Sequence, residues 1–369
     1  MIYLDRLKVW LTVLVVLHHT AITYGGEGGW YYYEHRNNMP TEAILTLFTA
    51  VNQSFFMGLF FFISGYVTPA SYDRKGCLPF LKDRFIRYGA PMLGYMLIVD
   101  PLLSYVSTGY RGSFFSYLRD EVWTDPFKGL IQFAPGPLWF LFALLLFSAG
   151  YALYRTMNKN RAASDVPTWT NRKIVIYLLA TGVANFLIRL WLPVGESVLS
   201  LQLAYFPAYI GLYIGGIAAY RGQWLQQFTA QAARKWAWVA VFVFISLPVV
   251  MILGGALDGN ISVFKGGATW QSACYSFMDP LLGLGISYVL LVKFRDRMNR
   301  HSKASPWLSA QAYAGYIIHP LVAVYFAYWL QGLDLFPLLK FILVGGLVVP
   351  AVFILAQCIR TLPGARKIL

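Results

Sequence analysis

The chain has 369 residues, of which 58% are hydrophobic and only 12% are charged, with a formal net charge of +14. This charge density is about half that of a soluble domain, so the composition excludes an ordinary soluble enzyme and predicts an integral membrane protein. The three cysteines lack paired spacing, and no cluster of His, Asp and Glu has ligand spacing, so neither a disulfide framework nor a metal site is expected.

Apolar segments of about 20 residues, the length that crosses a bilayer as a helix, recur along the whole chain. Charged or Gly/Pro-rich breaks separate ten of them, at residues 7–24, 43–70, 88–108, 136–154, 174–192, 201–220, 236–255, 272–292, 308–330 and 338–359. We therefore predict an all-α integral membrane protein, a bundle of about ten transmembrane helices. One transmembrane domain covers residues 1–369, and no separate soluble domain is expected.

The basic residues are distributed unevenly among the predicted loops. If the N-terminus is cytoplasmic, 23 of the 30 Lys and Arg residues fall on the cytoplasmic side and seven on the other side. Because cytoplasmic loops of membrane proteins carry an excess of Lys and Arg, we predict that both termini are cytoplasmic in a multi-pass protein of the plasma membrane. Topology thus accounts for the net charge, and nucleic acid is not an expected partner.

In the first predicted span, the segment LDRLKVWLTVLVVLHHT places two histidines where lipid or packed protein is expected. Lys8 and His19 are eleven residues apart, which puts them within ~20° of one helix face and ~16 Å apart along the axis. His18 points ~100° away and is interpreted more simply as an interfacial hydrogen-bonding residue. Ionisable groups inside a membrane are functional candidates, and an imidazole titrates near neutrality, as a general base must. His19 is therefore the candidate base.

The next segments in the chain each allow two interpretations. The aromatic run at residues 30–33, in the first outer loop, suits either an interfacial belt or the binding of sugar rings. In FFMGLFFFISGY, Ser64 and Gly65 suit either close helix packing, which we favour, or the lining of an acyl-chain path. Arg84 and Arg87 are three residues apart and are expected on one helix face, as a phosphate site or as positive-inside anchors.

Two later polar residues each precede a proline within or near the end of a predicted span. His319 precedes Pro320, which removes a backbone hydrogen bond and commonly kinks a helix. The histidine could satisfy a freed carbonyl or line a tunnel, and the sequence does not choose. Asp279, before Pro280, could orient an imidazole or bind acceptor hydroxyls, but we favour an interfacial cap.

These segments together resemble the membrane-bound acyltransferase-3 family. Lys8 and His19 match its first-helix signature of a basic residue, ten residues and a histidine. Four further motifs occur in the family's order: the run ending in Ser64-Gly65-Tyr66, the Arg84-x-x-Arg87-x-x-x-Pro91 segment, the Leu138-Trp139-Phe140-Leu141 segment and the late Tyr316-x-x-His319-Pro320 segment. Pro137 differs from the family, which often has histidine before Leu-Trp.

The resemblance implies an O-acyltransferase that moves an acyl group, most simply acetyl or succinyl, from cytoplasmic acyl-CoA to a hydroxyl of an extracytoplasmic carbohydrate or glycolipid. His19 would be the base or a transient acyl carrier, and Lys8 would help to position the donor. Arg84 and Arg87 would bind the donor phosphates, and Trp139 would wall the cavity. Acyl-CoA is thus expected as a substrate rather than as a tightly bound cofactor, and membrane lipid surrounds the protein.

Two other classes of protein share some of these features. A proton-coupled secondary transporter also has many spans, kinked helices and buried histidines. A flippase for envelope glycans, or a structural subunit of an envelope-synthesis complex, would need no Lys8 and His19 pair. The ordered set of motifs favours the acyltransferase over both.

Overall fold

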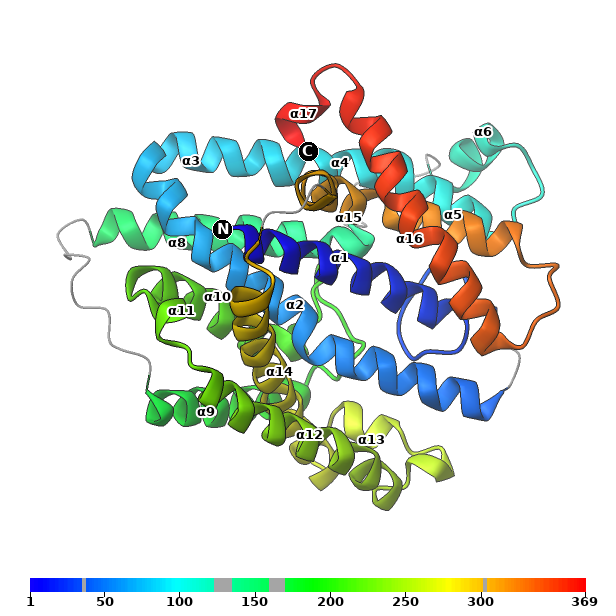
Figure 1. The fold of residues 1–369 in the computed structure, drawn as a ribbon. Coiled ribbons are helices and arrows are strands. Elements are labelled where there is room, and N and C mark those ends of the chain that lie inside the picture. The colour runs from blue at the N-terminus through cyan, green and yellow to red at the C-terminus, as the bar shows by residue number, and fades with distance from the viewer. Residues whose placement is uncertain (35–37, 123–134, 159–169, 301–303) are drawn as a thin grey trace.

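The computed structural model describes the whole chain except residues 35–37, 123–134, 159–169 and 301–303. The described part is helical and contains no strand; one isolated β-bridge joins Val198 and Leu201. Its longer helices are α1 (Ile2–Thr23), α2 (Met39–Lys75), α3 (Cys77–Arg84), α5 (Asp100–Thr108), α8 (Trp139–Met157), α9 (Asn171–Arg189), α10 (Phe206–Arg221), α12 (Ala230–Leu253), α14 (Trp270–Arg297), α15 (Ala304–Trp329) and α16 (Pro337–Thr361), as Figure 1 shows. The short helices are α4 (Ala90–Gly94), α6 (Phe114–Tyr117), α11 (Trp224–Gln227), α13 (Ser262–Lys265) and α17 (Ala365–Ile368).

Eight helical segments of the described chain are long and apolar enough to cross a membrane. They are Met39–Lys75, Cys77–Thr108, Gly136–Met157, Asn171–Arg189, Leu203–Arg221, Ala230–Leu253, Trp270–Arg297 and Pro337–Thr361. These eight correspond to eight of the ten predicted spans. The remaining two predicted spans form α1 and α15, which are helices of 22 and 26 residues outside that set. A multi-pass helical membrane protein is therefore supported, whereas ten crossings and cytoplasmic termini stay predictions.

The third predicted span is not one regular helix. Two π-helical turns, η1 (Phe85–Gly89) and η2 (Tyr95–Val99), separate α3, α4 and α5. A π-turn closes its hydrogen bonds five residues apart instead of four, so it changes the direction in which the following side chains point. Spacing rules for an α-helix therefore do not hold across η1.

Helices α2 and α10 pack with their backbones in contact. A Cβ atom added at Gly65 would lie 2.1 Å from the carbonyl oxygen of Tyr213, and one added at Gly216 would lie 2.1 Å from that of Phe62. Only glycine fits such an approach, which is common where helices associate inside membranes. The packing interpretation of the Ser64-Gly65 segment is therefore correct for Gly65.

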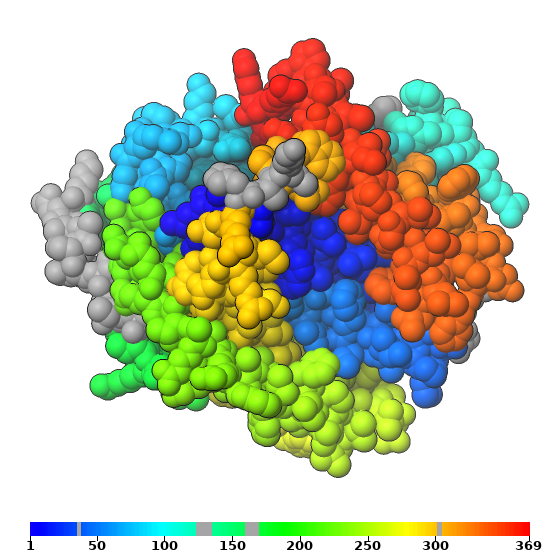
Figure 2. Space-filling view, viewed as in Figure 1, coloured from blue at the N-terminus to red at the C-terminus, as the bar shows by residue number. Residues whose placement is uncertain are grey.

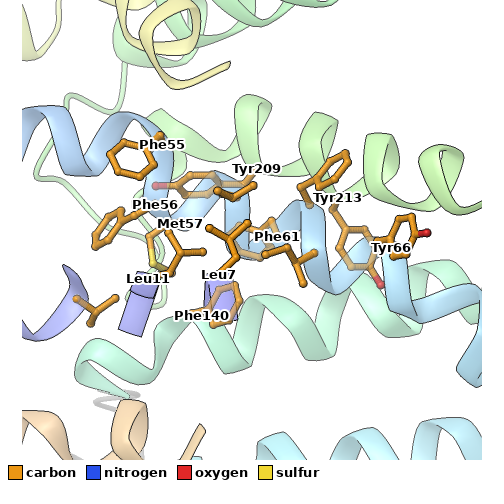
Figure 3. Close-up of a cluster of buried hydrophobic side chains, with 14 of the residues drawn as sticks. Leu7, Leu11, Phe55, Phe56, Met57, Phe61, Tyr66, Phe140, Tyr209 and Tyr213 are labelled. Carbon is orange, nitrogen blue, oxygen red and sulfur yellow. The ribbon is translucent and has the colours of Figure 1, made fainter. Parts of the chain in front are cut away.

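The main hydrophobic core lies between α1, α2, α8 and α10. Figure 3 shows Phe55, Phe56 and Met57 of α2 gathered with Tyr209 of α10 at one end of this cluster, and Tyr66 with Tyr213 at the other. Leu7 and Leu11 of α1 and Phe140 of α8 lie beneath them in the same view. The aromatic run of α2 thus serves mainly as core, and it continues directly into the site described below.

Helices α1 and α15 lie side by side and run in the same direction. Near their N-terminal ends, Arg6 donates a 2.9 Å hydrogen bond to Ser305, and thirteen residues further along α1, His19 faces His319 with ring centroids 5.2 Å apart. Helix α1 crosses the middle of the molecule and contacts α2, α14, α15 and α16. In Figure 2, dark-blue atoms of α1 are visible between α14 and α16. The histidine-bearing helix is therefore surrounded by four others.

Candidate active site

A cavity of about 570 Å³ lies where α1 and α9 end and where α2, α8, α10 and α14 begin. Loop residues 27–31, 136–137 and 194–202 and the short helix α13 contribute to its wall. The predicted topology assigns this end of the bundle to the extracytoplasmic side. Aromatic residues dominate the lining: Trp30, Tyr31, Phe56, Trp139, Tyr205, Tyr209, Phe264, Tyr275 and Tyr316.

Three imidazoles gather at this cavity. His18 and His19 line it, and their ring centroids are 5.3 Å apart with the planes perpendicular. The His19 ring stacks on the indole of Trp30 at 4.0 Å and on His319 at 5.2 Å. His319 does not line the cavity and is completely buried. Of the two histidines in α1, His19 is thus the one held between the outer loop and α15.

Each of the three imidazoles has a ring nitrogen without a hydrogen-bond partner among the described residues. His319 Nδ1 lies 2.6 Å from the carbonyl oxygen of Tyr316, so Nδ1 carries the proton and Nε2 holds a lone pair. Pro320 cannot donate to that carbonyl, which lies four residues before it, so His319 satisfies the group that the proline frees. Within the described residues, His18 Nδ1, His19 Nδ1 and His319 Nε2 are buried and have no hydrogen-bond partner.

The two candidate arginines lie in different environments. Arg84, at the end of α3, is 7% exposed; its guanidinium lies 5.0 Å from the Phe80 ring centroid and donates a 3.0 Å hydrogen bond to the Tyr88 hydroxyl. Arg87 lies in η1 and is exposed. The π-turn η1 begins directly after Arg84, so α-helix spacing does not fix the relation of the two side chains, and a shared face stays a prediction. Neither side chain lines the cavity.

One face of α15 connects the arginine segment with the histidines. Tyr313, Tyr316 and His319 follow at intervals of three residues, so they share a face and span ~9 Å along the axis. The Tyr313 hydroxyl donates to the carbonyl of Arg87, the Tyr316 hydroxyl donates to the carbonyl of Pro137, and His319 stacks on His19. We call these three residues the α15 row.

The remaining predicted residues are placed as follows. Trp139, the first residue of α8, lines the cavity and stacks on Tyr209 at 5.8 Å. Lys8 is 43% exposed, pairs with Asp5 at 2.8 Å and does not line the cavity. Ser64 does not line it either. The structure thus brings His19, His319 and Trp139 together at one site but leaves Lys8, Arg84, Arg87 and Ser64 outside it.

We expected Asp279 to cap a helix at the interface, but it does not. It lies inside α14, is 5% exposed, and its carboxylate is 3.5 Å from the guanidinium of Arg189. The proline that follows it suggested a helix end, but the tertiary packing supplies a partner from the end of α9. Asp279 is instead half of a buried ion pair behind the cavity wall.

The outer loop that carries Trp30 and Tyr31 is tied to the bundle by contacts that sequence reasoning missed. The Tyr31 hydroxyl donates a 2.6 Å hydrogen bond to Asp100, and burial together with this carboxylate raises the pKa of Tyr31. Lys340 of α16 is 1% exposed and pairs with Glu34 at 2.5 Å, while Lys265 pairs with Glu27 at 2.6 Å. The aromatic run was a visible signal in the sequence, whereas its distant partners were not.

Apolar helices around an aromatic cavity with buried imidazoles define a multi-pass membrane protein with an enzyme-like site. The family model of an acyltransferase domain matches residues 1–357, and the chain therefore belongs to the acyltransferase-3 family of membrane acyltransferases. This membership favours acyl transfer over the transporter and flippase alternatives.

Among curated proteins, the chain is similar to "Glucans biosynthesis protein C" of Escherichia coli O6:K15:H31 (strain 536 / UPEC), with 24% identity over 343 residues. The match covers 88% of this chain and 83% of the relative. The protein of the same name from Escherichia coli strain K12 matches with the same identity and coverage. No solved structure matches the chain.

Proposed function

We propose that this protein is a plasma-membrane O-acyltransferase that moves an acyl group, most simply acetyl or succinyl, from cytoplasmic acyl-CoA to a hydroxyl of an extracytoplasmic glycan. The observation that carries the proposal is the position of His19. Its half-buried imidazole lines the cavity and stacks on Trp30 and His319, and its buried Nδ1 atom has no hydrogen-bond partner among the described residues. The glycan acceptor is suggested by relatives whose name refers to glucan biosynthesis.

The cavity lining suits a carbohydrate. Aromatic planes pack against the apolar faces of sugar rings, and a few polar groups between them select the orientation. Gln53 and Gln202 line the cavity, as does Ser197. The indole nitrogen of Trp30 is buried with no partner in the described part of the chain, so it is available to a substrate oxygen.

In the proposed step, an acceptor hydroxyl donates its hydrogen bond to the His19 imidazole, which takes the proton as the oxygen attacks the thioester carbon. The new C–O bond forms, the C–S bond breaks, and the imidazolium returns the proton to the CoA sulfur. In the alternative, a nitrogen of His19 attacks the thioester carbon, so that a C–N bond forms, the C–S bond breaks and CoA leaves as its thiol. The acceptor oxygen then forms the C–O bond as the C–N bond breaks, and its proton restores the neutral imidazole.

The donor would approach along the α15 row. Arg84 and Arg87 lie at its Tyr313 end and His19 at its His319 end. Guanidinium groups bind phosphates in planar pairs of hydrogen bonds, so these arginines would hold the nucleotide part of acyl-CoA while the thioester reaches His19. Lys8, eleven residues before His19, would contribute positive charge nearer the start of α1.

The test measures thiol release and label transfer by the protein in nanodiscs, with acetyl- or succinyl-CoA and a gluco-oligosaccharide. We expect His19→Ala to lower kcat by about 100-fold or more, the usual contribution of a positioned base. His18→Ala should lower it less, because the His18 ring lies against Phe56, whereas the His19 ring stacks on Trp30 and His319. Trp10→Phe is the control, because Trp10 lies in α1 but does not line the cavity. Equal activity of His19→Ala and the wild type would refute the proposal.

A further inference from the structure

Behind the cavity wall lies an ion pair that the proposed reaction does not use. Arg189, the last residue of α9, is completely buried, and its Nη2 atom is 3.5 Å from the carboxylate of Asp279 in α14. Its Nη1 atom donates a 3.1 Å hydrogen bond to the Ser276 hydroxyl. Neither Arg189 nor Asp279 lines the cavity.

The guanidinium touches the cavity indirectly, through two tyrosine rings. It lies 4.9 Å from the ring centroid of Tyr275 and 5.3 Å from that of Tyr205, and both rings line the cavity. A guanidinium is planar and always charged, so it attracts the faces of aromatic rings and fixes their tilt. Arg189 is therefore in direct contact with part of the wall.

The contact continues along a row of rings. Tyr205 stacks on Tyr209 at 6.1 Å with an interplanar angle of 23°, and Tyr209 stacks on Trp139 at 5.8 Å with an angle of 24°. Gln53 donates a 2.9 Å hydrogen bond to the Tyr209 hydroxyl, and every member of this row lines the cavity. We call Tyr205, Tyr209 and Trp139 the aromatic wall. Arg189 lies at its Tyr205 end.

Stability does not explain why an ion pair occupies this place. Arg189 Nε and Nη2 and Asp279 Oδ1 have no hydrogen-bond partner in the described structure. Buried ion pairs with such unsatisfied atoms can be replaced by apolar residues of similar size without loss of stability. What an apolar pair would not provide is the directed contact with Tyr205 and Tyr275.

We propose that Arg189, held by Asp279, is a positioning residue that orients the aromatic wall for the acceptor glycan. The proposal rests on the proposed function, because it assigns the aromatic wall to the acceptor. Arg189 does not touch the reacting atoms. It has no role in binding acyl-CoA, whose expected site lies at the Tyr313 end of the α15 row.

The decisive variant is the double replacement Arg189→Met with Asp279→Leu. It removes both charges at similar volume, so the melting temperature should stay near that of the wild type. With a gluco-oligosaccharide as acceptor, we expect KM for the acceptor to rise about tenfold while KM for acetyl-CoA changes less than about twofold. Arg189→Lys, which keeps the charge but loses the planar group, should raise the acceptor KM as well.

The matched control is Arg221→Met. Arg221 also pairs with a carboxylate, Asp73 at 2.7 Å, and also lies over a tyrosine ring, Tyr220 at 5.8 Å, but it does not line or back the cavity. Its replacement should leave the acceptor KM unchanged. If the double variant has a normal acceptor KM, or if KM for acetyl-CoA rises as much as that for the acceptor, the positioning role is overturned.

A binding measurement separates this proposal from the proposed function. If the wild type consumes no acyl-CoA, the acyltransfer step fails, but calorimetry with the same gluco-oligosaccharide still tests the wall. We then expect binding by the double variant to be about tenfold weaker than by the wild type. Equal affinities, or no binding by the wild type, would overturn the positioning role.

Discussion

Individual residues of α15 combine structural and chemical roles. Pro320 frees the carbonyl of Tyr316, and His319 Nδ1 fills that place at 2.6 Å. The same imidazole presents its plane to His19. The sequence left two interpretations of His319 open, and the structure supports the satisfaction of the freed carbonyl while it also places the ring against the candidate base. The hydrogen bond of His319 thus fixes one neighbour of His19.

We therefore expect His319→Leu to lower both stability and activity. Loss of the hydrogen bond leaves a buried carbonyl unsatisfied, which costs about 1–3 kcal/mol in unfolding free energy. The leucine also removes a flat ring from beside His19, so kcat should fall about tenfold. Thermal unfolding and thiol release in nanodiscs measure the two effects. A variant with lower stability but an unaltered kcat would show that His319 has only the structural role.

At the level of elements, the extent of the helices followed from the sequence better than their internal irregularities did. Runs of apolar residues between charged breaks marked ten spans, and the described structure is helical along most of each, although η1 and η2 interrupt the third segment. The π-turns η1 and η2 have no such signal, because one extra residue per turn hardly alters local hydrophobicity. Nor does the local pattern indicate that Arg84 is buried while Arg87 is exposed. The aromatic segment of α2 was correctly expected to form core packing, and Gly65 is a residue at which α2 closely approaches the backbone of α10.

The contact between α2 and α10 gives a test at this scale. Gly65→Val would place a side chain against the carbonyl oxygen of Tyr213, so α10 would have to move away from α2. We expect a loss of about 1–3 kcal/mol in stability, as for other overpacked cores, and a lower melting temperature in detergent. Gly150→Ala in α8 is the matched control, because no atom lies within 4 Å of its added Cβ. Unchanged melting of Gly65→Val would contradict the close approach.

Across the whole molecule, the cavity depends on segments far apart in the chain. Trp30 and Tyr31 reach it from a loop that Lys340 and Asp100 hold in place. Tyr205 reaches it from the turn before α10 and Tyr275 from α14, with Arg189 behind both. The ion pairs Lys340–Glu34 and Arg189–Asp279 each join residues that are far apart in the sequence. The site is therefore a product of the complete bundle.

The ion pair between Lys340 and Glu34, which ties the outer loop to α16, can be tested by Lys340→Met. This change breaks the buried contact with Glu34, so we expect stability to fall by about 1–3 kcal/mol and the acceptor KM to rise as Trp30 and Tyr31 lose their fixed position. For stability, Lys265→Met is the comparison, since its pair with Glu27 is largely exposed and worth about 0–1 kcal/mol. Equal unfolding curves for the two variants would argue against a stabilising role of the Lys340–Glu34 pair.

The sequence by itself determined the helical membrane class, the approximate spans and the candidate base His19, because hydrophobicity, charge bias and motif spacing are properties of neighbouring residues. Only the tertiary structure decided that His19 meets Trp30 and His319, and that Asp279 pairs with Arg189, ninety positions earlier in the chain. It also showed that Arg84 and Arg87 point into different environments. These outcomes depend on how helices distant in sequence pack and on where a helix widens, and neither is encoded in a local pattern.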